Sequence, residues 1–348
     1  MIKKSKNIGF ILSLFLLSTL LFSGCKKKNK HILDLKEEKV EVKLNRLEKK
    51  LFSVETEQDY VALDQLDSNF ISLYKNEIMR HVTGGIRYSV PEQADAYIRF
   101  LHFKDIEHLF NAVDSTFENL DFLQKELNSA FSYYHHYFPS LVIPTFNTAI
   151  TQLYSQNILL DSAIYVSLDY YLGDDFAPYK SPSLELPEYK IRTFRKDYIT
   201  RNAVFAWIDA QFQKSKNSQS RLLDEMIYEG KLLYAMDRLM PEMPDSLKIG
   251  YEKGKIEWCF ENEFQIWSFL INENLLYSTE LARFRGIITD APFSTGPNVP
   301  QESPARIATW SGWQIVRKYM DKNPKITLLD LMNETDSDKI LRLSGYKP

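Results

Sequence analysis

The chain is poor in cysteine and in glycine for its length. Of its 348 residues, 12 are glycine and two are cysteine, Cys25 and Cys259. Two cysteines allow at most one disulfide, so the fold must depend on its core. Neither of the two common glycine-rich phosphate loops occurs. The sequence therefore excludes a disulfide scaffold and gives no support to a nucleotide-binding protein.

Histidine is scarce and confined to the first part of the chain. The six histidines stand at positions 31, 81, 102, 108, 135 and 136, and residues 137–348 contain none. The common zinc peptidases need two histidines at i and i+4 on one helix, with a glutamate beside the first. His135 and His136 are adjacent, and His102 and His108 are six apart, so neither pair shares a helix face. We expect no metal site and no cofactor.

The patterns of a hydrolase triad are missing as well. No Gly-x-Ser-x-Gly segment occurs, and no histidine follows a serine placed at a strand-to-helix turn. Cys259 lies between Trp258 and Phe260 in an expected helix, which is typical of a small buried thiol and not of a nucleophile. We therefore expect a protein that is not an enzyme.

Positive charge is not grouped in the expected domain. The chain has 43 Lys and Arg against 46 Asp and Glu, a net charge of −3. Lys26, Lys27 and Lys28 form the one basic cluster after the first 24 residues. Because phosphate binding depends on grouped positive charge, nucleic acid is not an expected partner.

The first 24 residues have the organisation of a signal peptide. Lysines at positions 3, 4 and 6 precede an apolar run over 8–22, which is too short to span a bilayer. Cys25 follows Ser23 and Gly24 and resembles the lipid-modified cysteine of a bacterial lipobox. The alternative is an ordinary secretory peptide with an unrelated cysteine. Because each buried acyl methylene contributes roughly 0.8 kcal/mol, we expect acylated Cys25 to hold the protein on membrane lipid.

Hydrophobic periodicity predicts a mainly α fold with a small β-sheet (α+β). The expected regions are a lipoprotein signal peptide over 1–24, a lipidated tether over 25–38 and one globular domain over 39–348. Helices and a small sheet are expected over 39–190, and a helical half over 191–348. The predicted helices cover 56–80, 92–112, 116–137, 197–213, 219–239, 252–276 and 303–321. The predicted strands cover 40–47, 141–146 and 163–168, with a turn at 156–157 and an irregular loop over 287–303.

Two of these helices carry a carboxylate within an apolar stripe. Glu229 fills the vacant place in a series formed by Leu222, Met226, Leu233, Met236 and Met240. Glu263 does the same in a series formed by Ile256, Phe260, Trp267 and Leu270. A carboxylate in a dry interior needs a donor or a raised pKa. The last long helix offers the candidate donors Arg306, Trp310, Trp313, Gln314 and Arg317.

We expect these groups to form a buried polar network that fixes the packing of the helices. A remnant active site, and glutamates that reach solvent at the stripe edge, are the alternatives. The last helix also carries Ala305, Ala308 and Gly312 at spacings of three and four, which predicts close approach of another helix. Four aromatic residues lie close together in the segment 131–138: Phe131, Tyr133, Tyr134 and Tyr137. They could line a groove that binds glycan or peptide, or they could form a buried cluster.

Several of these stretches resemble the GldB-like gliding-motility lipoproteins. They are SLDYYLG at 167–173, MIYEGKLLY at 226–234, NEFQIW at 262–267, ENLLYST at 273–279 and the segment over 302–316. The motif positions are Asp169, Gly173, Gly230, Gln265, Trp267 and Trp313. Ala305 and Ala308 stand where the family pattern has glycines, and Ser311 where an aliphatic residue is usual. The lipobox at Cys25 agrees with the resemblance.

The resemblance implies a role in surface gliding or in the linked type IX protein secretion system, through envelope proteins of that machinery. The family is not characterised as catalytic. It implies a protein anchored to the inner or outer membrane, with its domain outside the cytoplasm. The order of elements is also similar to a zincin-like (gluzincin-type) scaffold that lacks the HExxH metal site. In that scaffold Glu229 would stand at the position of the third metal ligand. Arg201, Asn202 and Asp209, on the predicted helix over 197–213, would stand in place of the histidines.

A second hypothesis remains open at this point. The chain would then be a divergent metal-dependent peptidase that uses the oxygen ligands Asp169, Glu229 and Glu263.

Overall fold

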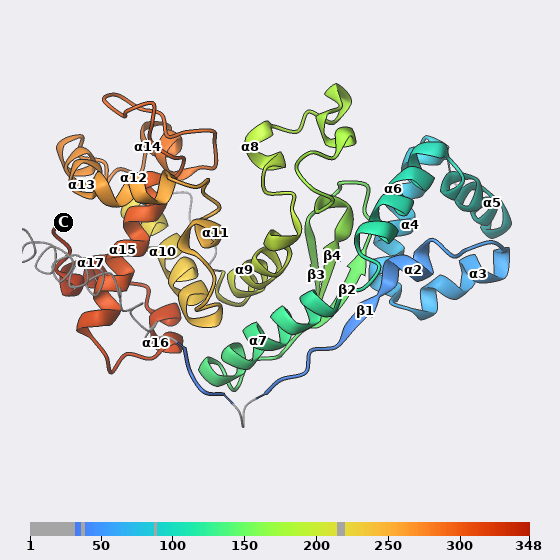
Figure 1. The fold of residues 1–348 in the computed structure, drawn as a ribbon, viewed down its shortest axis with the longest axis horizontal. Helices are drawn as coiled ribbons and strands as arrows, with labels where there is room; N and C mark the ends of the chain where they lie inside the picture. Colours follow the sequence, from blue (N-terminus) through green and yellow to red (C-terminus); the bar gives the residue numbers. More distant parts are fainter. Residues whose placement is uncertain (1–31, 36–38, 87–88, 214–219) are drawn as a thin grey trace, which may run out of the picture. The chain divides into compact units, whose positions relative to one another are not determined.

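The fold combines a four-stranded sheet with a larger number of helices (Figure 1). The structure is a computed structural model and describes residues 32–35, 39–86, 89–213 and 220–348. The predicted signal peptide and Cys25 lie outside these residues. Residues 35–348 form one compact unit. Within the described residues, no helix combines the length and the apolar character needed to cross a bilayer.

The sheet is mixed, with the strand order β1-β2-β4-β3. Its strands are β1 (Leu44–Arg46), β2 (Thr145–Ala149), β3 (Asn157–Leu160) and β4 (Ala163–Ser167). β2 pairs in parallel with β1 and β4, and β3 pairs antiparallel with β4. Phe146, Ile164, Tyr165 and Val166 are fully buried. β-branched and aromatic residues suit such buried strand positions, so the sheet forms part of the core.

The strand predictions were correct in kind and partly wrong in position. The predicted strand over 163–168 corresponds to β4, but β2 begins only at Thr145, and β3 begins at the second residue of the predicted turn. The predicted opening strand shortens to Leu44–Arg46. The amides of Val40 and Val42 instead donate to side chains of Ser132 and Asn128, each at 2.9 Å. The alternation of apolar and charged residues at 40–44 therefore reflects packing against the helix that contains Asn128 and Ser132, as well as strand pairing.

Before the second strand, the chain is helical. The helices are α2 (Leu47–Leu51), α3 (Glu57–Ala62), the 3-10 helix η2 (Leu63–Gln65), α4 (Ser68–Thr83), α5 (Val90–Leu101), α6 (Lys104–Thr116) and α7 (Asp121–Tyr137). The helix predicted over 56–80 is interrupted because Asp67 caps α4, accepting from the Phe70 amide at 3.0 Å. The helix predicted over 92–112 is likewise divided, into α5 and α6.

After the sheet, the chain is again helical. The 3-10 helices are η3 (Leu168–Tyr170), η4 (Ala177–Lys180), η5 (Pro182–Leu184) and η6 (Lys196–Tyr198). The α-helices are α8 (Glu188–Ile191), α9 (Ile199–Phe212), α10 (Leu222–Leu239), α11 (Asp245–Ile249), α12 (Lys255–Glu261), α13 (Glu263–Asn272), α14 (Leu281–Ile288), α15 (Ile307–Lys322), α16 (Leu328–Asn333) and α17 (Ser337–Ser344). The short helices α11 and α14 were not predicted.

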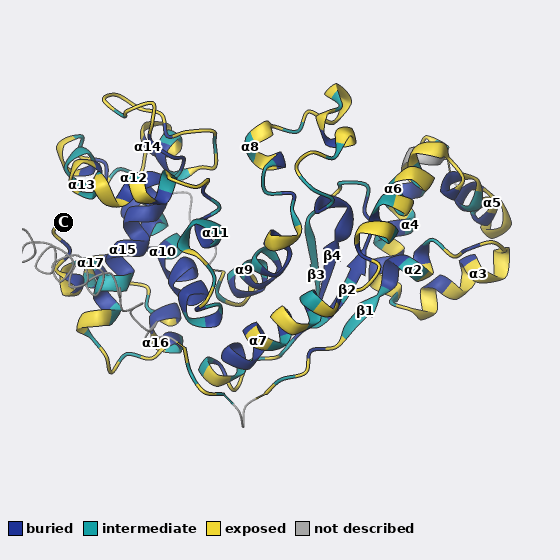
Figure 2. Cartoon of the chain, in the orientation of Figure 1, coloured by how far each residue is buried: buried dark blue, intermediate teal, exposed yellow. Residues whose placement is uncertain are grey.

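α10 and α15 form the centre of this helical half. They make the most extensive contact between two helices of the described chain. Figure 2 shows both helices mostly in the colour of buried residues. Trp310 and Trp313 on α15 are fully buried, as are Met226 and Met236 on α10. Polar side chains on this pair therefore lie in or beside the core, where their partners determine their charge.

Candidate functional site

Glu229 on α10 lies near arginines from two other elements. Arg201 on α9 donates from Nε to the Lys248 carbonyl at 2.9 Å, and Arg306 Nη2 donates to the Ile249 carbonyl. These consecutive carbonyls at the end of α11 bring the two guanidinium groups together. Burial raises the pKa of Glu229, while the positive charges of Arg306 and Arg201 oppose that rise. We name Glu229, Arg201 and Arg306 the arginine–glutamate cluster.

Both arginines of this cluster lie in an unusual environment. Burial and the nearby charge of Arg306 together lower the pKa of Arg201 to about 10. Arg306 precedes α15 with a φ of 55°, in the left-handed region that non-glycine residues rarely adopt. Its Nε has no hydrogen-bond partner among the described residues. The carboxylates of Asp209 and Glu225 also act on Glu229. The two positive charges of Arg201 and Arg306 disfavour a divalent cation at this position.

Arg317, predicted to join the same network, contacts a different carboxylate. Its Nε and Nη2 donate to Asp237 at 2.7 and 2.8 Å, and its Nη1 donates to Asp245 at 2.8 Å. Lys248 Nζ and Trp313 Nε1 also donate to Asp237, at 2.9 and 3.0 Å. Burial would raise the pKa of Asp237, but the bonds and charges of Arg317 and Lys248 hold it below its usual value. Asp237 is therefore an ionised, fully partnered buried carboxylate.

Glu263 lies at a third place. It accepts a hydrogen bond of 2.7 Å from the Tyr346 hydroxyl, near the end of the chain. The ring of Trp267 meets the ring of Tyr346 edge to face, with centroids 5.1 Å apart. The apolar stripe predicted around Glu263 is broken because α12 ends and α13 begins at Asn262. Phe260 is 48% exposed, and its ring meets the ring of buried Trp310 edge to face, with centroids 5.4 Å apart.

The five residues predicted as one network are thus divided among separate contacts. Glu229 and Arg306 share the arginine–glutamate cluster, Arg317 binds Asp237, and Glu263 binds Tyr346. Gln314 is buried, and its amide lies 3.5 Å from the Trp310 carbonyl one turn earlier on the same helix. The division arises because the residues lie on different helices. Glu229 is on α10, Glu263 is on α13, and the other three are at the start of α15 or on it, so each side chain meets different neighbours.

Asp169 lies in η3, directly after β4. It is fully buried and accepts from the amides of Thr151 and Leu153 at 3.1 and 2.8 Å. Burial raises its pKa to about 6, although these backbone bonds act in the opposite direction. The carboxylate holds the loop before β3, where Gln152 and Leu153 have φ values of 56° and 61°.

The oxygen ligands of the peptidase hypothesis therefore have separate partners. Asp169 is bonded to the loop before β3, Glu229 lies beside two arginines, and Glu263 is bonded to Tyr346. In the part of the chain that the structure describes, no three His, Cys, Asp or Glu side chains are grouped so as to hold a metal ion.

Several other predicted residues have clear structural positions. Cys259 is buried, and burial raises the pKa of its thiol to about 12, as expected for an inert thiol. Gly230 packs against α15, and the Gly173 amide donates to the Phe194 carbonyl at 3.0 Å. Gln265 is exposed. Trp313 lies under Arg317, whose guanidinium carbon is 3.8 Å from the ring centroid.

The aromatic crowd over 131–138 is a buried cluster. Phe131, Tyr133 and Tyr134 are at most 8% exposed, and the Phe131 ring packs against Phe146 of the sheet. The alternative of an open groove for glycan or peptide was therefore wrong for these rings. They belong to the interface between α7 and the sheet.

The sequence prediction missed Asp237 and Lys248. The signal for Asp237 was present, because it follows Met226 and Leu233 at helical spacings of eleven and four. Lys248 had no comparable signal, since the short helix that carries it was not predicted. Its position became visible only through the fold.

Comparison with known proteins gives one family. A family model described as gliding motility protein GldB matches residues 28–348, which include the sheet and the whole helical half. No curated protein and no solved structure has a significant match to the chain. The matched region contains the buried Asp169, the Gly230 contact and Trp313. The chain therefore belongs to the GldB family of gliding-motility lipoproteins.

Proposed function

We propose that this protein acts without catalysis, by binding envelope proteins of the gliding or type IX secretion machinery. The arginine–glutamate cluster carries this proposal. Glu229 is the residue best placed on the helical half to be a relic metal ligand, and its charged neighbours include Arg201 and Arg306. Guanidinium groups remain protonated under all ordinary conditions, so they stabilise the carboxylate in place of a metal ion.

We infer that the helical half descends from a gluzincin-type scaffold that has lost its metal. The order of elements supports this inference, because α9 follows the sheet and Glu229 follows on α10. α9 carries Arg201, Asn202 and Asp209 in place of the histidines that such a peptidase would have on this helix. Asn202 Nδ2 donates to the Tyr171 hydroxyl at 3.2 Å, so it serves a structural contact.

We further infer attachment to a membrane through acylated Cys25. The membership in a lipoprotein family supports this attachment, and the lysines that follow Cys25 suit a tether beside lipid head groups. The domain would then act at the inner or outer membrane, outside the cytoplasm.

An exposed apolar stripe on α12 and α13 supports a role in binding other proteins. Phe260, Phe264 and Ile271 are 48%, 63% and 46% exposed. Phe264 and Ile271 are seven residues apart on α13, which suits one face of that helix, and Phe260 lies near the end of α12. Glu257 and Glu261 are exposed beside them on α12. We name these five residues the α12–α13 stripe.

The charge of the α12–α13 stripe favours a protein partner over a lipid surface. Anionic head groups would be repelled by Glu257 and Glu261, whereas a partner segment with apolar and basic side chains would complement both features. Exposed aromatic and aliphatic side chains of this kind mark interaction sites more often than isolated apolar residues do.

Two measurements test the proposed function. Metal analysis of the purified full chain should find zinc far below one equivalent, and stoichiometric zinc that disappears in Glu229→Ala would establish the metallopeptidase alternative. Deletion of the gene should reduce surface spreading or the export of secreted cargo. Normal spreading together with normal export in the deletion strain would refute the assignment to this machinery.

A further inference from the structure

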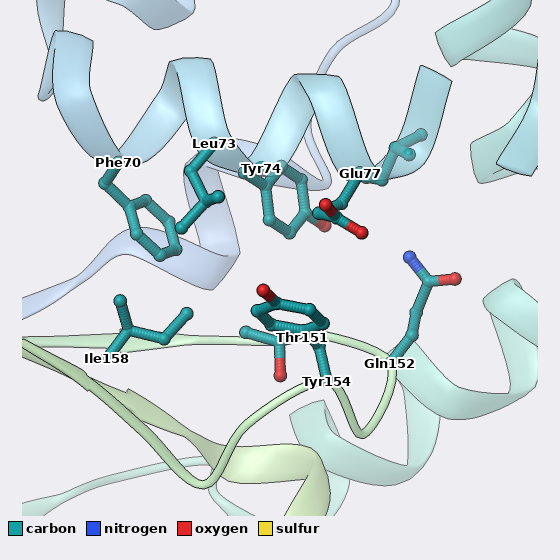
Figure 3. Close-up of a pocket in the computed structure, with 9 residues that line it drawn as sticks. Phe70, Leu73, Tyr74, Glu77, Thr151, Gln152, Tyr154 and Ile158 are labelled. Atoms are coloured by element: carbon teal, nitrogen blue, oxygen red, sulfur yellow. The ribbon is translucent and has the colours of Figure 1, made fainter. Parts of the chain in front are cut away.

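A slot opens between α4 and the loop that leads into β3. Its volume is about 300 Å³, near the lower end of the range for small-molecule sites. Figure 3 shows Phe70, Tyr74 and Glu77 projecting from α4 toward Tyr154, Gln152 and Ile158 on the opposite side. It lies in the half of the protein that contains the sheet, and it shares no residue with the arginine–glutamate cluster or the α12–α13 stripe.

The two ends of the slot differ in chemistry. Phe70, Leu73 and Ile158 line one end, and the carboxylate of Glu77 and the amide of Gln152 lie toward the other (Figure 3). Positions 70, 74 and 77 share one face of α4, so the helix itself places apolar groups before the acid. A ligand that fills this space must have an apolar stem and a polar head.

The polar end is suited to a positive charge. Tyr74 is 5% exposed and lines the slot between its apolar end and Glu77. Tyr154 presents an aromatic ring that is 56% exposed. The Glu77 carboxylate and the face of the Tyr154 ring both attract a cation and repel an anion.

Glu77 already pairs with a cation of the chain itself. Arg80, one turn after Glu77 on α4, donates from Nη2 to the Glu77 carboxylate at 2.5 Å. The Arg80 side chain is 63% exposed and that of Glu77 is 25% exposed. Exposed ion pairs of this kind contribute little to stability, so an incoming cation can replace Arg80 at low free-energy cost.

The wall opposite α4 is held in place by buried groups. Gln152 and Leu153 adopt left-handed backbone conformations that non-glycine residues rarely keep without support. The carboxylate of Asp169 binds the amides of Thr151 and Leu153, and the Tyr170 hydroxyl donates to the Leu153 carbonyl. The fold therefore fixes Gln152 and Tyr154 opposite Glu77 before any ligand arrives, which reduces the entropy lost on binding.

We propose that this slot binds an alkylammonium group, with the charged nitrogen at Glu77 and the Tyr154 ring and the carbon stem toward Phe70 and Ile158. A lysine side chain of a partner protein and a free alkylamine share this chemistry. The inference is independent of the proposed function, since it uses none of the residues that carry that function.

The test measures binding of matched probes to the full chain in zwitterionic lipid nanodiscs by ligand-observed NMR. The first probe is Nα-acetyl-lysine methylamide, and its isostere without the ammonium group is Nα-acetyl-norleucine methylamide. The lysine derivative should bind saturably and at least about fivefold more tightly than the norleucine derivative. Equal affinities, or no saturable binding by the lysine derivative, would refute the proposal.

Variants place the binding at the slot. Glu77→Gln and Tyr154→Ala should each weaken binding of the lysine derivative about fivefold or more, and Arg80→Ala should strengthen it because the competing guanidinium is removed. Asp95→Asn, an exposed change on the neighbouring α5, should have no effect. Unchanged binding in both Glu77→Gln and Tyr154→Ala, with far-UV circular dichroism like that of the wild type, would also refute the proposal.

A second probe separates the two sources of the ligand. Butylammonium has the charge and stem of lysine without the peptide backbone. Tighter binding of the lysine derivative would assign the slot to a side chain of a partner protein, and tighter binding of butylammonium would assign it to a free amine. Either result supports an alkylammonium site.

Discussion

Gly230 on α10 lies directly against Gly312 on α15. A Cβ atom built on Gly230 would stand 2.5 Å from the carbonyl carbon and oxygen of Gly312, a separation that real side chains essentially never show. A Cβ built on Gly312 would clash with the Met226 carbonyl. The two helix backbones thus touch where neither has a side chain. This contact brings the polar groups of α10 within reach of α15.

The first prediction follows from this contact. Gly312→Ala should lower the free energy of unfolding by about 3 kcal/mol or more, because the added methyl group forces the two backbones apart. Urea unfolding followed by circular dichroism measures the change. Ala282→Ser on the exposed face of α14 is the control and should change stability by less than about 0.5 kcal/mol. A Gly312→Ala protein as stable as the wild type would show that the helices do not pack this closely.

The second prediction concerns Asp237. Its pKa is held below the usual value of 3.8, so the ionised carboxylate stabilises the fold above that pH, and the stabilisation is lost as the pH falls through the folded pKa. Asp237→Asn should lower the free energy of unfolding at pH 7 by about 3–5 kcal/mol, since Arg317 and Lys248 lose their shared counter-charge. The difference from the wild type should narrow in acid.

Urea unfolding across the acid range measures this dependence, with Asp95→Asn as an exposed control. A constant difference between Asp237→Asn and the wild type at every pH would contradict the prediction.

The third prediction concerns Asp169, whose pH dependence has the opposite sign. Burial raises the folded pKa from 3.8 to about 6, so this group stabilises the fold most below the unfolded value and loses that contribution as the pH rises through about 6. Asp169→Asn should flatten this part of the stability profile because an amide does not titrate. It should also lower stability by about 1–3 kcal/mol, since one backbone amide loses its acceptor.

The measurement is urea unfolding of both proteins at a series of pH values between 3.8 and about 6. If the slope of the wild type persists unchanged in Asp169→Asn, another group must cause it.

The fourth prediction concerns the α12–α13 stripe. The double change Phe264→Ser and Ile271→Ser should weaken partner binding, by about 2 kcal/mol if either residue is an interface hot spot. The expected result is loss of spreading or export in a deletion strain that carries the variant, with unfolding like that of the wild type, because both side chains are exposed. Val61→Ser, at a similarly exposed apolar site on α3, is the control. The deletion strain that carries Val61→Ser should spread and export cargo like the wild type.

Full activity of the double variant at normal protein level would remove the stripe from the proposed function. Loss of activity together with loss of protein would mean instead that the two residues support the fold.

Sequence patterns determined much of this protein without the fold. The small number of cysteines excluded a disulfide scaffold, and the period of apolar residues placed most of the long helices. Stretches around Asp169, Gly230 and Trp313 were sufficient for the family, which the match over 28–348 confirmed. These features are local, because composition, helix period and short motifs depend on neighbours along the chain.

Tertiary structure alone decided which polar groups meet. Periodicity placed Glu229 and Glu263 on apolar faces, but it carried no information on their partners. A break at Asn262 divided the stripe around Glu263 between two helices, and an unpredicted short helix supplied Lys248 to Asp237. Contacts between residues such as Asp237 and Arg317, 80 positions apart, depend on how helices cross. The crossing of the helices follows from the packing of the whole core, so no single segment of the sequence determines it.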